Sequence, residues 1–257
     1  MKSTILSEND TKLIEKAISL HGRILSTREL LVIFKERYTT ASAYKRINLL
    51  SKAGWLKRIK NGLYLIIDSM TARFQIDVSL LSIANALVIE SYISLSHALN
   101  YYNMFDQYIS TIVSVTDKEN KEYAVDNHTF TFSKVKKDMY FGFSAKMENG
   151  KLIRIADAEK AMIDYLYLDK SFGSASLVFE KMRDYHQELD LKKLQEYALR
   201  SGATIQREVG FMLDELKLDS SLLHQAIKNN RSASHFTKDS KLFNAKWRLY
   251  YDDRIIG

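Results

Sequence analysis

The sequence predicts an α+β protein of two parts, one over residues 1–68 and a larger one over residues 69–257. Three observations support this division. Excess positive charge is confined to the first part, three helical patterns and a β-hairpin pattern fill that part, and the remainder mixes strand-like and helical runs. With 257 residues, 46% of them hydrophobic, the chain is long enough to bury a core in each part.

The charge of the chain is unevenly distributed. The chain carries 38 Lys and Arg against 31 Asp and Glu, a formal net charge of +7. Residues 1–68 hold 13 basic and 6 acidic residues, and the other 25 basic and 25 acidic residues cancel. Between Lys35 and Lys60, eight basic residues accompany one acid, Glu36. This surplus indicates a polyanionic partner for the N-terminal part.

Three helices are expected at the start of the chain, each with a residue that can cap it. Ser7, Ser26 and Thr39 are suitable N-caps, and Glu29 completes a capping box with Ser26. The expected helices run from Glu8 to about Leu20, from Ser26 to near Tyr38, and from Thr40 to Ala53. Gly54 can end the third helix because glycine readily adopts the left-handed conformation.

The third helix has one apolar side and one polar side at 100° per residue. The apolar side is formed by Ala43, Ile47, Leu50, Ala53 and, at its edge, Leu49. The polar side is formed by Ala41, Tyr44, Lys45, Asn48 and Lys52. Two cations, two hydrogen-bonding side chains and no acid are what a helix in the major groove of DNA needs.

A β-hairpin pattern follows the third helix. Residues 55–59 and 63–67 are rich in β-formers, and Asn61-Gly62 between them is a strong hairpin signal. Lys57, Arg58 and Lys60 make the hairpin basic, as in the wing of a winged helix-turn-helix. The expected DNA contacts are therefore Thr40, Ala41, Ser42, Tyr44, Lys45, Asn48, Lys52, Lys57, Arg58, Lys60 and Asn61. The alternative is a small helical domain whose basic face is only solvated.

The larger part shows a mixed α/β pattern. Helices are expected over residues 76–88, 95–102 and 158–168, and through most of 174–229. Ser94 is expected to cap the second of these helices and Asp157 the third. Strands are expected over 111–116, 128–132, 139–143 and 151–155. Asp157 and Glu159 are expected to stabilise the start of their helix, whose last turn holds Asp164.

Motifs of catalysis are scarce. The sequence has no Walker loop, no G-x-G-x-x-G, no G-x-S-x-G and no H-E-x-x-H, and its six histidines show no metal-ligand spacing. We therefore expect no enzymatic activity, no cofactor and no metal. One alternative remains, a metal-dependent nuclease that uses Asp117, Glu119 and Lys121. A charged turn is the better interpretation of this segment, since Glu-x-Lys is common in a lysine-rich chain.

The composition also bears on location. Cysteine is absent, which excludes disulfides and thiolate zinc sites and fits a reducing compartment. Residues 1–11 lack the apolar core of a signal peptide, and the most apolar stretch, residues 80–93, is interrupted by Ser82, Asn85 and Glu90. We expect a cytoplasmic protein with no membrane partner.

Several segments resemble the AbiEi family of antitoxins. The hairpin segment Lys60–Tyr64 is similar to the family's RGLY wing. Residues 92–102 resemble its YISLWSALSYYG segment, residues 155–166 its IADPEKALLDYL segment, and residues 247–250 are similar to its C-terminal tail. The sequence departs from the family where Asn61 replaces a common arginine and where Ala158 replaces a proline, in a chain without proline.

The resemblance implies a function that composition and periodicity do not. It implies that the winged helix represses its own operon by binding double-stranded promoter DNA, with inverted repeats as the expected operator. It also implies that residues 69–257 form an antitoxin domain that counters a nucleotidyltransferase-like toxin of the AbiEii type, in a system linked to abortive phage infection. Direct contact with the toxin is left open. The alternative is a stand-alone winged-helix transcription factor whose C-terminal domain binds a ligand or oligomerises.

Overall fold

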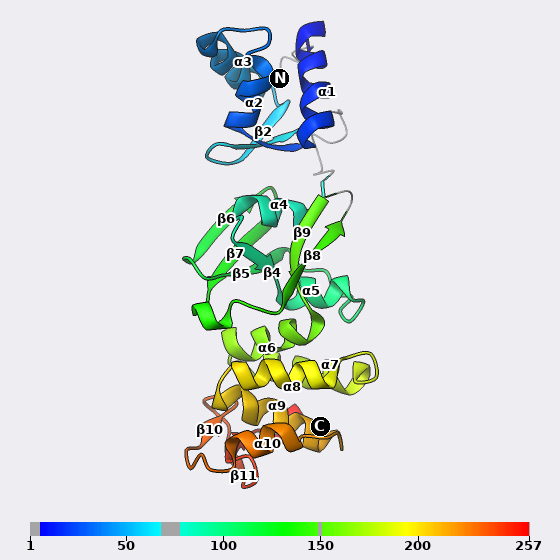
Figure 1. The fold of residues 1–257 in the computed structure, drawn as a ribbon, viewed down its shortest axis with the longest axis vertical. Helices are drawn as coiled ribbons and strands as arrows, with labels where there is room; N and C mark the ends of the chain where they lie inside the picture. The colour runs from blue at the N-terminus through cyan, green and yellow to red at the C-terminus, as the bar shows by residue number, and fades with distance from the viewer. Residues whose placement is uncertain (1–5, 68–77, 149–150, 257) are drawn as a thin grey trace.

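The computed structural model describes residues 6–67, 78–148 and 151–256, which form a mixed α+β structure. We call residues 6–67 the N-terminal unit and the rest the second unit. The two units follow one another along the long axis of the molecule, and the chain ends lie far apart (Figure 1). The expected boundary at residue 68 lies outside the described residues.

The N-terminal unit consists of three helices and a small antiparallel sheet. Its elements are α1 (Glu8–His21), β1 (Ile24–Ser26), α2 (Thr27–Phe34), α3 (Thr40–Lys52), β2 (Leu56–Lys60) and β3 (Leu63–Ile66). The sheet has the order β1-β3-β2, so β3 lies in the middle. Strand β1 is an addition to the two strands that the sequence pattern predicted.

The caps of these helices form as their sequence predicted. The side chains of Ser7, Ser26 and Thr39 each accept a hydrogen bond from a backbone N–H in the first turn, and Ser26 and Glu29 form a capping box. Helix α2 ends at Phe34, earlier than expected, and turns continue to Tyr38. The strands of the hairpin are joined at Asn61-Gly62, where Gly62 has a φ of +76° that favours glycine.

The small sheet of the N-terminal unit is covered on both faces. Leu25, Leu56 and Ile66 pack with the helices of their own unit. On the opposite face, Ile59 and Leu65 belong to the hydrophobic core of the second unit. Because successive side chains of a strand alternate between faces, β3 contributes to two cores at once. The sheet therefore joins the two units.

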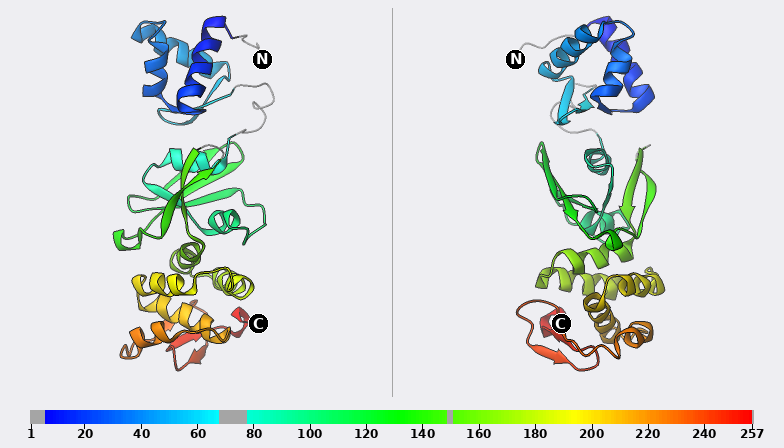
Figure 2. Two further views of the ribbon diagram at one scale, coloured as in Figure 1. Left: turned by 45° about the vertical axis from the view of Figure 1, so that its right-hand side comes forward. Right: turned by 60° about the vertical axis from the view of Figure 1, so that its left-hand side comes forward.

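The second unit begins with a bent, mixed six-stranded sheet. Its elements are α4 (Leu80–Leu87), β4 (Ser91–Ile93), α5 (Leu95–Tyr101), β5 (Thr111–Thr116), β6 (Lys121–Val125), β7 (His128–Lys134), β8 (Phe143–Glu148) and β9 (Lys151–Ala156). The strand order is β6-β7-β5-β4-β9-β8. Pairs β5–β7 and β4–β9 are parallel and the others antiparallel. Helix α4 lies between the two arms of this sheet (Figure 2).

One expected strand in this sheet is wrong. Residues 139–143 were expected to be extended, but a single 3₁₀ turn at Lys137–Met139 and a loop occupy this region. Met139 and Phe141 are buried there by packing against the core, so their hydrophobicity reflects tertiary contact and not a strand period. Strand β8 begins only at Phe143.

Helices and a second small sheet complete the chain. The helices are α6 (Ala158–Leu168), α7 (Phe172–Tyr185), α8 (Leu191–Arg200), α9 (Ala203–Glu215) and α10 (Ser221–Ile227), and the strands are β10 (Ser234–His235), β11 (Leu242–Asn244) and β12 (Leu249–Tyr251). This second sheet has the order β10-β12-β11. Of the helices described, none combines the length and the apolar character needed to span a bilayer.

Trp247 anchors this second small sheet to the helices. The ring is fully buried against α9, and its Nε1–H donates to Asp214 Oδ2 at 2.7 Å. It lies so close to Gly210 that a Cβ at that position would be 2.1 Å from the ring. Glycine at position 210 thus makes room for the tryptophan, which explains a residue that otherwise weakens a helix interior.

Candidate nucleic-acid interface

Helix α3 presents the predicted polar surface outward. Ala43, Ile47 and Leu50 are buried at helical spacing and hold the helix against the N-terminal core. The opposite surface consists of exposed Ala41, Tyr44, Lys45, Asn48 and Lys52, with Tyr44 46% exposed. Leu49, expected at the edge of the buried side, is instead 55% exposed. A single acid-free surface of α3 is therefore open to a partner.

The start of α3 adds the remaining helical candidates. Thr40, Ala41 and Ser42 are exposed in the first turn. The backbone N–H of Ser42 donates to Thr39 Oγ1 at 3.4 Å, and Thr39 Oγ1 donates to Ser42 Oγ at 3.1 Å. Helix N-termini carry partial positive charge, so this turn suits a phosphate oxygen.

Arg46, the third cation of α3, has a different environment. Its guanidinium binds the buried carboxylate of Asp10 on α1, with Nε 2.7 Å from Oδ1. Burial alone would raise the pKa of Asp10, but hydrogen bonds from Arg46 and Ser7 outweigh it and the pKa is lowered. Arg46 thus fixes α3 against α1, which positions Lys45 and Asn48 without joining their surface.

Not all cations of the hairpin are as free to contact a partner as those on the open surface of α3. Lys57 forms an ion pair with Asp126, in the connection between β6 and β7. Lys60 donates from Nζ to the carbonyl of Leu87 at the end of α4. Burial lowers the pKa of both lysines. Two of the four candidate hairpin residues therefore contact the second unit.

The other two hairpin candidates bind each other. Arg58 is exposed, and its guanidinium donates to Asn61 Oδ1 at 2.5 Å. This contact orients Arg58 at the turn of the hairpin. Figure 1 shows the hairpin at the side of the N-terminal unit that faces the second unit, with α3 farther away. The surface of α3 is thus open, whereas two residues of the hairpin are already bound to the second unit.

A buried polar cluster lies in the second unit, where residues 92–102 and 155–166 meet. Asp164 on α6 accepts hydrogen bonds from Lys160 Nζ at 2.5 Å, Ser94 Oγ at 2.7 Å and Tyr92 Oη at 3.1 Å. Lys160 Nζ also lies 4.5 Å from the centroid of the Phe141 ring. Burial raises the pKa of Asp164 against the opposing effect of Lys160, and burial raises that of Tyr92. This cluster joins β4 to α6 inside the core.

These contacts correct two expectations about helix caps. Ser94 occupies the N-cap of α5, but its hydroxyl binds Asp164 and makes no cap hydrogen bond. Asp157 occupies the N-cap of α6, but its carboxylate binds Lys193 at 2.9 Å and the Tyr197 hydroxyl at 2.9 Å on α8. Both side chains stabilise tertiary packing, because partners from distant segments offer stronger contacts than the adjacent backbone.

The acids of the α6 start therefore bind a neighbouring helix. Glu159 is buried and accepts from the backbone N–H of Asp190 at 2.9 Å, while Lys193 lies 3.3 Å away. Burial opposes protonation of Lys193, but the hydrogen bonds and charges of Asp157 and Glu159 outweigh it and raise its pKa. This arrangement ties α8 to α6 and leaves little carboxylate surface for chemistry.

Asp117 and Glu119 of the nuclease alternative lie in the connection between β5 and β6, and Lys121 is the first residue of β6. Lys121 Nζ is 3.6 Å from Glu119 Oε1, and Lys118 Nζ is 3.8 Å from Asp117 Oδ1. Each acid thus faces a lysine. Within residues 6–67, 78–148 and 151–256, no group of three or more His, Cys, Asp or Glu residues could hold a metal ion.

A cleft of about 620 Å³ lies between the two units. The N-terminal unit contributes Ile24, Glu29 and Leu63, and the second unit contributes residues of α4 and β9, including Arg154. Lys151 also lines the cleft, and its Nζ donates to the carbonyl of His21 at 2.5 Å. The cleft combines apolar walls with charged groups of both signs, which suits a small amphipathic ligand.

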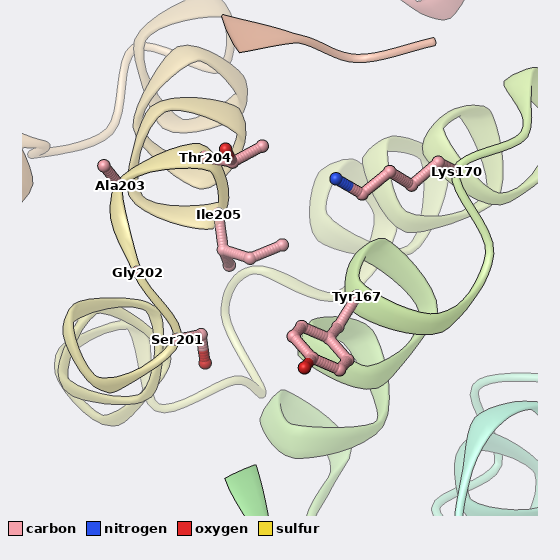
Figure 3. A pocket seen from close by; sticks show the side chains of 7 residues that line it. All are labelled: Tyr167, Lys170, Ser201, Gly202, Ala203, Thr204 and Ile205. Carbon is pink, nitrogen blue, oxygen red and sulfur yellow. The ribbon is translucent and has the colours of Figure 1, made fainter. Parts of the chain in front are cut away.

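A second hollow, of about 420 Å³, lies where α9 begins. Figure 3 shows Lys170 and Tyr167 on one side and the turn from Ser201 to Ile205 on the other. Gly202, the N-cap of α9, has no side chain to cap the helix. Thr204 Oγ1 is already 3.2 Å from Ser234 Oγ, within the second unit. This hollow is separate from the α3 surface.

Comparison with known proteins gives a structural likeness without a family. No family model matches the chain, and no curated protein matches it. The crystal structure of the RV2827C protein from Mycobacterium tuberculosis is similar, with a TM-score of 0.62 over 95% of this chain and 92% of that chain. Only 10% of the aligned residues are identical, so the likeness concerns the fold alone.

Proposed function

We propose that this protein is a DNA-binding antitoxin that represses its own promoter and acts by binding, not by catalysis. The observation that carries the proposal is the exposed, acid-free surface of α3, in a unit with the element order of a winged helix. The AbiEi-like segments supply the toxin–antitoxin context. Such a protein would act in the cytoplasm, where its promoter lies.

In this proposal α3 enters the major groove. Lys45 and Lys52 lie about two turns apart on the same face of the helix and bind phosphates on either side of the groove. Asn48 lies between them, where its amide can bind an adenine edge with two hydrogen bonds. Tyr44 packs against the sugar–phosphate backbone, and the first turn, Thr40 to Ser42, receives a phosphate oxygen.

The hairpin makes a smaller contribution in the arrangement described above. Lys57 and Lys60 are held by Asp126 and the Leu87 carbonyl, so Arg58 and Asn61 are the wing residues that face solvent. We expect them to contact one phosphate or the minor groove. If Lys57 also binds DNA, it has to leave Asp126 first.

The second unit is proposed to counter a nucleotidyltransferase-like toxin of the AbiEii type. Its interior is held together by buried hydrogen bonds and apolar packing, which leaves its surface as the part that acts on a partner. Co-expression with the neighbouring gene tests this assignment. Rescue of growth from a toxic neighbour supports it, and a harmless neighbour contradicts it.

The DNA proposal is tested with the double variant Lys45→Ala/Lys52→Ala and a labelled duplex from the protein's own promoter. Loss of two phosphate contacts should weaken binding roughly tenfold or more at moderate salt and reduce the salt slope by about 2. The matched control is Lys137→Ala/Lys192→Ala, which removes two exposed lysines of the second unit. Equal loss in both variants would attribute the effect to net charge and contradict the assignment to α3.

A second candidate function is a ligand-responsive transcription factor. The cleft between the units favours it, because both units line the same space and a ligand there would bear on how they are held together. Such a ligand would change promoter affinity in the wild type. The ligand should leave promoter affinity unchanged in Leu63→Trp, because the tryptophan fills the cleft. A neighbouring gene that is harmless on co-expression would support this function over the antitoxin.

A further inference from the structure

An aromatic column crosses the outer face of the second small sheet. His235 on β10, Tyr250 on β12 and Phe243 on β11 occupy paired positions in the sheet, so they share one face. The ring centroids of His235 and Tyr250 are 4.3 Å apart with planes only 9° from parallel. Those of Phe243 and Tyr250 are 4.9 Å apart at 47°. Each strand contributes one ring to this row, in which His235 and Tyr250 are stacked and Phe243 is tilted against Tyr250.

Both ends of this column are open. His235 is exposed and Phe243 is 48% exposed, whereas the residues next to Tyr250 point inward. Leu249 is fully buried, and Tyr251 packs on Phe211 of α9 with centroids 4.7 Å apart. The inward face therefore holds the sheet in place. The outward rings take no part in this packing against α9. A further flat ring can therefore stack on the column at either end.

The segment that forms the second small sheet has a surplus of positive charge. Residues 228–256 carry seven basic and three acidic residues, a surplus that the neutral count of the larger part conceals. Of the acids, Asp252 is bound by Arg254 through two hydrogen bonds. Lys241 lies two residues before Phe243, and strand alternation places it on the outer face. Lys241 and Lys238 are exposed and make no side-chain hydrogen bond or ion pair with the described residues.

We propose that this face binds single-stranded nucleic acid. Unpaired bases stack on the ends of the column at His235 and Phe243, and Lys238 and Lys241 contact the phosphates on either side. Aromatic rings that extend a stack, next to cations without partners, are what single strands require, because every base presents a flat face and every nucleotide a charge. The bases of a duplex are already stacked and cannot enter the column. The site lies at the far end of the molecule from α3 and is independent of promoter binding.

The test measures the affinity of the full chain for labelled 12-nucleotide strands of uridine or thymidine, in a Lys45→Ala/Lys52→Ala background that removes the α3 contribution. Phe243→Ala and His235→Ala should each weaken binding roughly five- to fiftyfold. Leu242→Ala is the matched control, since Leu242 is 45% exposed on the same strand and points to the opposite face, and it should change affinity less than twofold. Thermal unfolding of each variant verifies that the sheet remains intact.

Two further measurements test the phosphate contacts and distinguish RNA from DNA. Lys238→Ala/Lys241→Ala should flatten the salt dependence by about 1.4 in slope, the value for two phosphate contacts on a single strand. Stronger binding of uridine than of thymidine strands would identify RNA as the ligand, and the reverse would identify DNA. No binding to either strand at low salt, or binding unaffected by Phe243→Ala and His235→Ala in folded protein, would overturn the proposal and leave the column as a surface for a protein.

Discussion

The two small sheets of this protein differ in what covers them. The first, β1-β3-β2, is buried on both faces, with Leu25 and Ile66 in the N-terminal core and Ile59 and Leu65 in the core of the second unit. The second, β10-β12-β11, is buried on one face and carries rings on the other. A three-stranded sheet thus serves as a joint between units in one place and as an open surface in the other.

The difference separates stability from recognition. In the first sheet, the hairpin that was expected to approach DNA is held by contacts to another unit, so its apolar residues contribute mainly to stability. In the second sheet, the outward rings contribute little to the core and remain available. The role of a small sheet thus depends on whether its second face packs against another part of the protein. The residue types in its strands matter less.

The largest expected effect is the loss of the anchor beneath the second sheet. Trp247→Ala removes a fully buried ring and the hydrogen bond to Asp214, so it should destabilise the protein by about 3–5 kcal/mol. Denaturant unfolding measures this change. The open face predicts the opposite for Phe243→Ala, which should cost less than about 1 kcal/mol. Similar costs for the two variants would show that the outer rings also hold the sheet together.

The next effect concerns the joint. Leu65→Ala creates a cavity at a fully buried position between the two units and should cost about 2–4 kcal/mol. Hydrogen exchange should rise in β3 and in the elements on both of its sides, α4 included. If exchange rises only within the N-terminal unit, β3 does not couple the two cores. Leu20→Ala, at an exposed leucine of α1, is the control and should leave stability within about 0.5 kcal/mol.

The sequence predicted the local features of the N-terminal unit well. The caps at Ser7, Ser26 and Thr39 and the turn at Asn61-Gly62 depend on residues within four positions, so a single segment contains the information. The outward surface of α3 followed from helical periodicity in the same way. Local hydrogen bonds and a fixed period are visible without knowledge of the rest of the chain.

Contacts between distant segments were not predicted. Asp157 and Ser94 sit at N-cap positions but bind partners from other elements, and Lys57 and Lys60 bind the second unit. One signal was present in the sequence: residues 63–67 form an unbroken apolar run, which is typical of a strand buried on both faces. The aromatic column was hidden because its three rings come from three short strands with little period of their own.

Two buried carboxyl groups, Glu208 on α9 and Asp10 on α1, should make the stability of the protein depend on pH in opposite directions. Beneath the second sheet, Glu208 on α9 is buried and its Oε2 has no hydrogen-bond partner among the described residues, so burial raises its pKa well above the ordinary 4.5. The folded state then binds more protons than the unfolded state. Stability therefore falls as pH rises above 4.5, by about 1.4 kcal/mol per unit until the folded-state pKa is reached.

Glu208→Gln removes this penalty, because the amide has no charge to lose. The variant should be more stable than the wild type at pH 8 and should approach it near pH 4.5, as thermal unfolding at the two values will show. In the N-terminal unit, the lowered pKa of Asp10 acts with the reverse sign. Its contribution is present above the ordinary value of 3.8 and is lost as pH falls through the lower folded-state value, a loss that Asp10→Asn should abolish. A wild-type profile that is flat between pH 4.5 and 8 would contradict the assignment to Glu208.

The smallest expected effect is on the contact between the hairpin and the second unit. Asp126→Asn removes the charge that pairs with Lys57 and keeps a residue type that tolerates the φ of +54° at this position. Because both side chains are about one-third exposed, stability should fall by no more than about 1 kcal/mol. DNA affinity should respond in the other direction, because the released Lys57 gains freedom to reach a phosphate. We expect promoter binding to be two- to fivefold tighter at low salt, with a steeper salt dependence. Asp138→Ala, which removes an exposed acid elsewhere in the second unit, controls for net charge. Equal gains in both variants would mean that Lys57 stays at the joint, and that the hairpin contributes to packing between the units more than to the proposed DNA contacts.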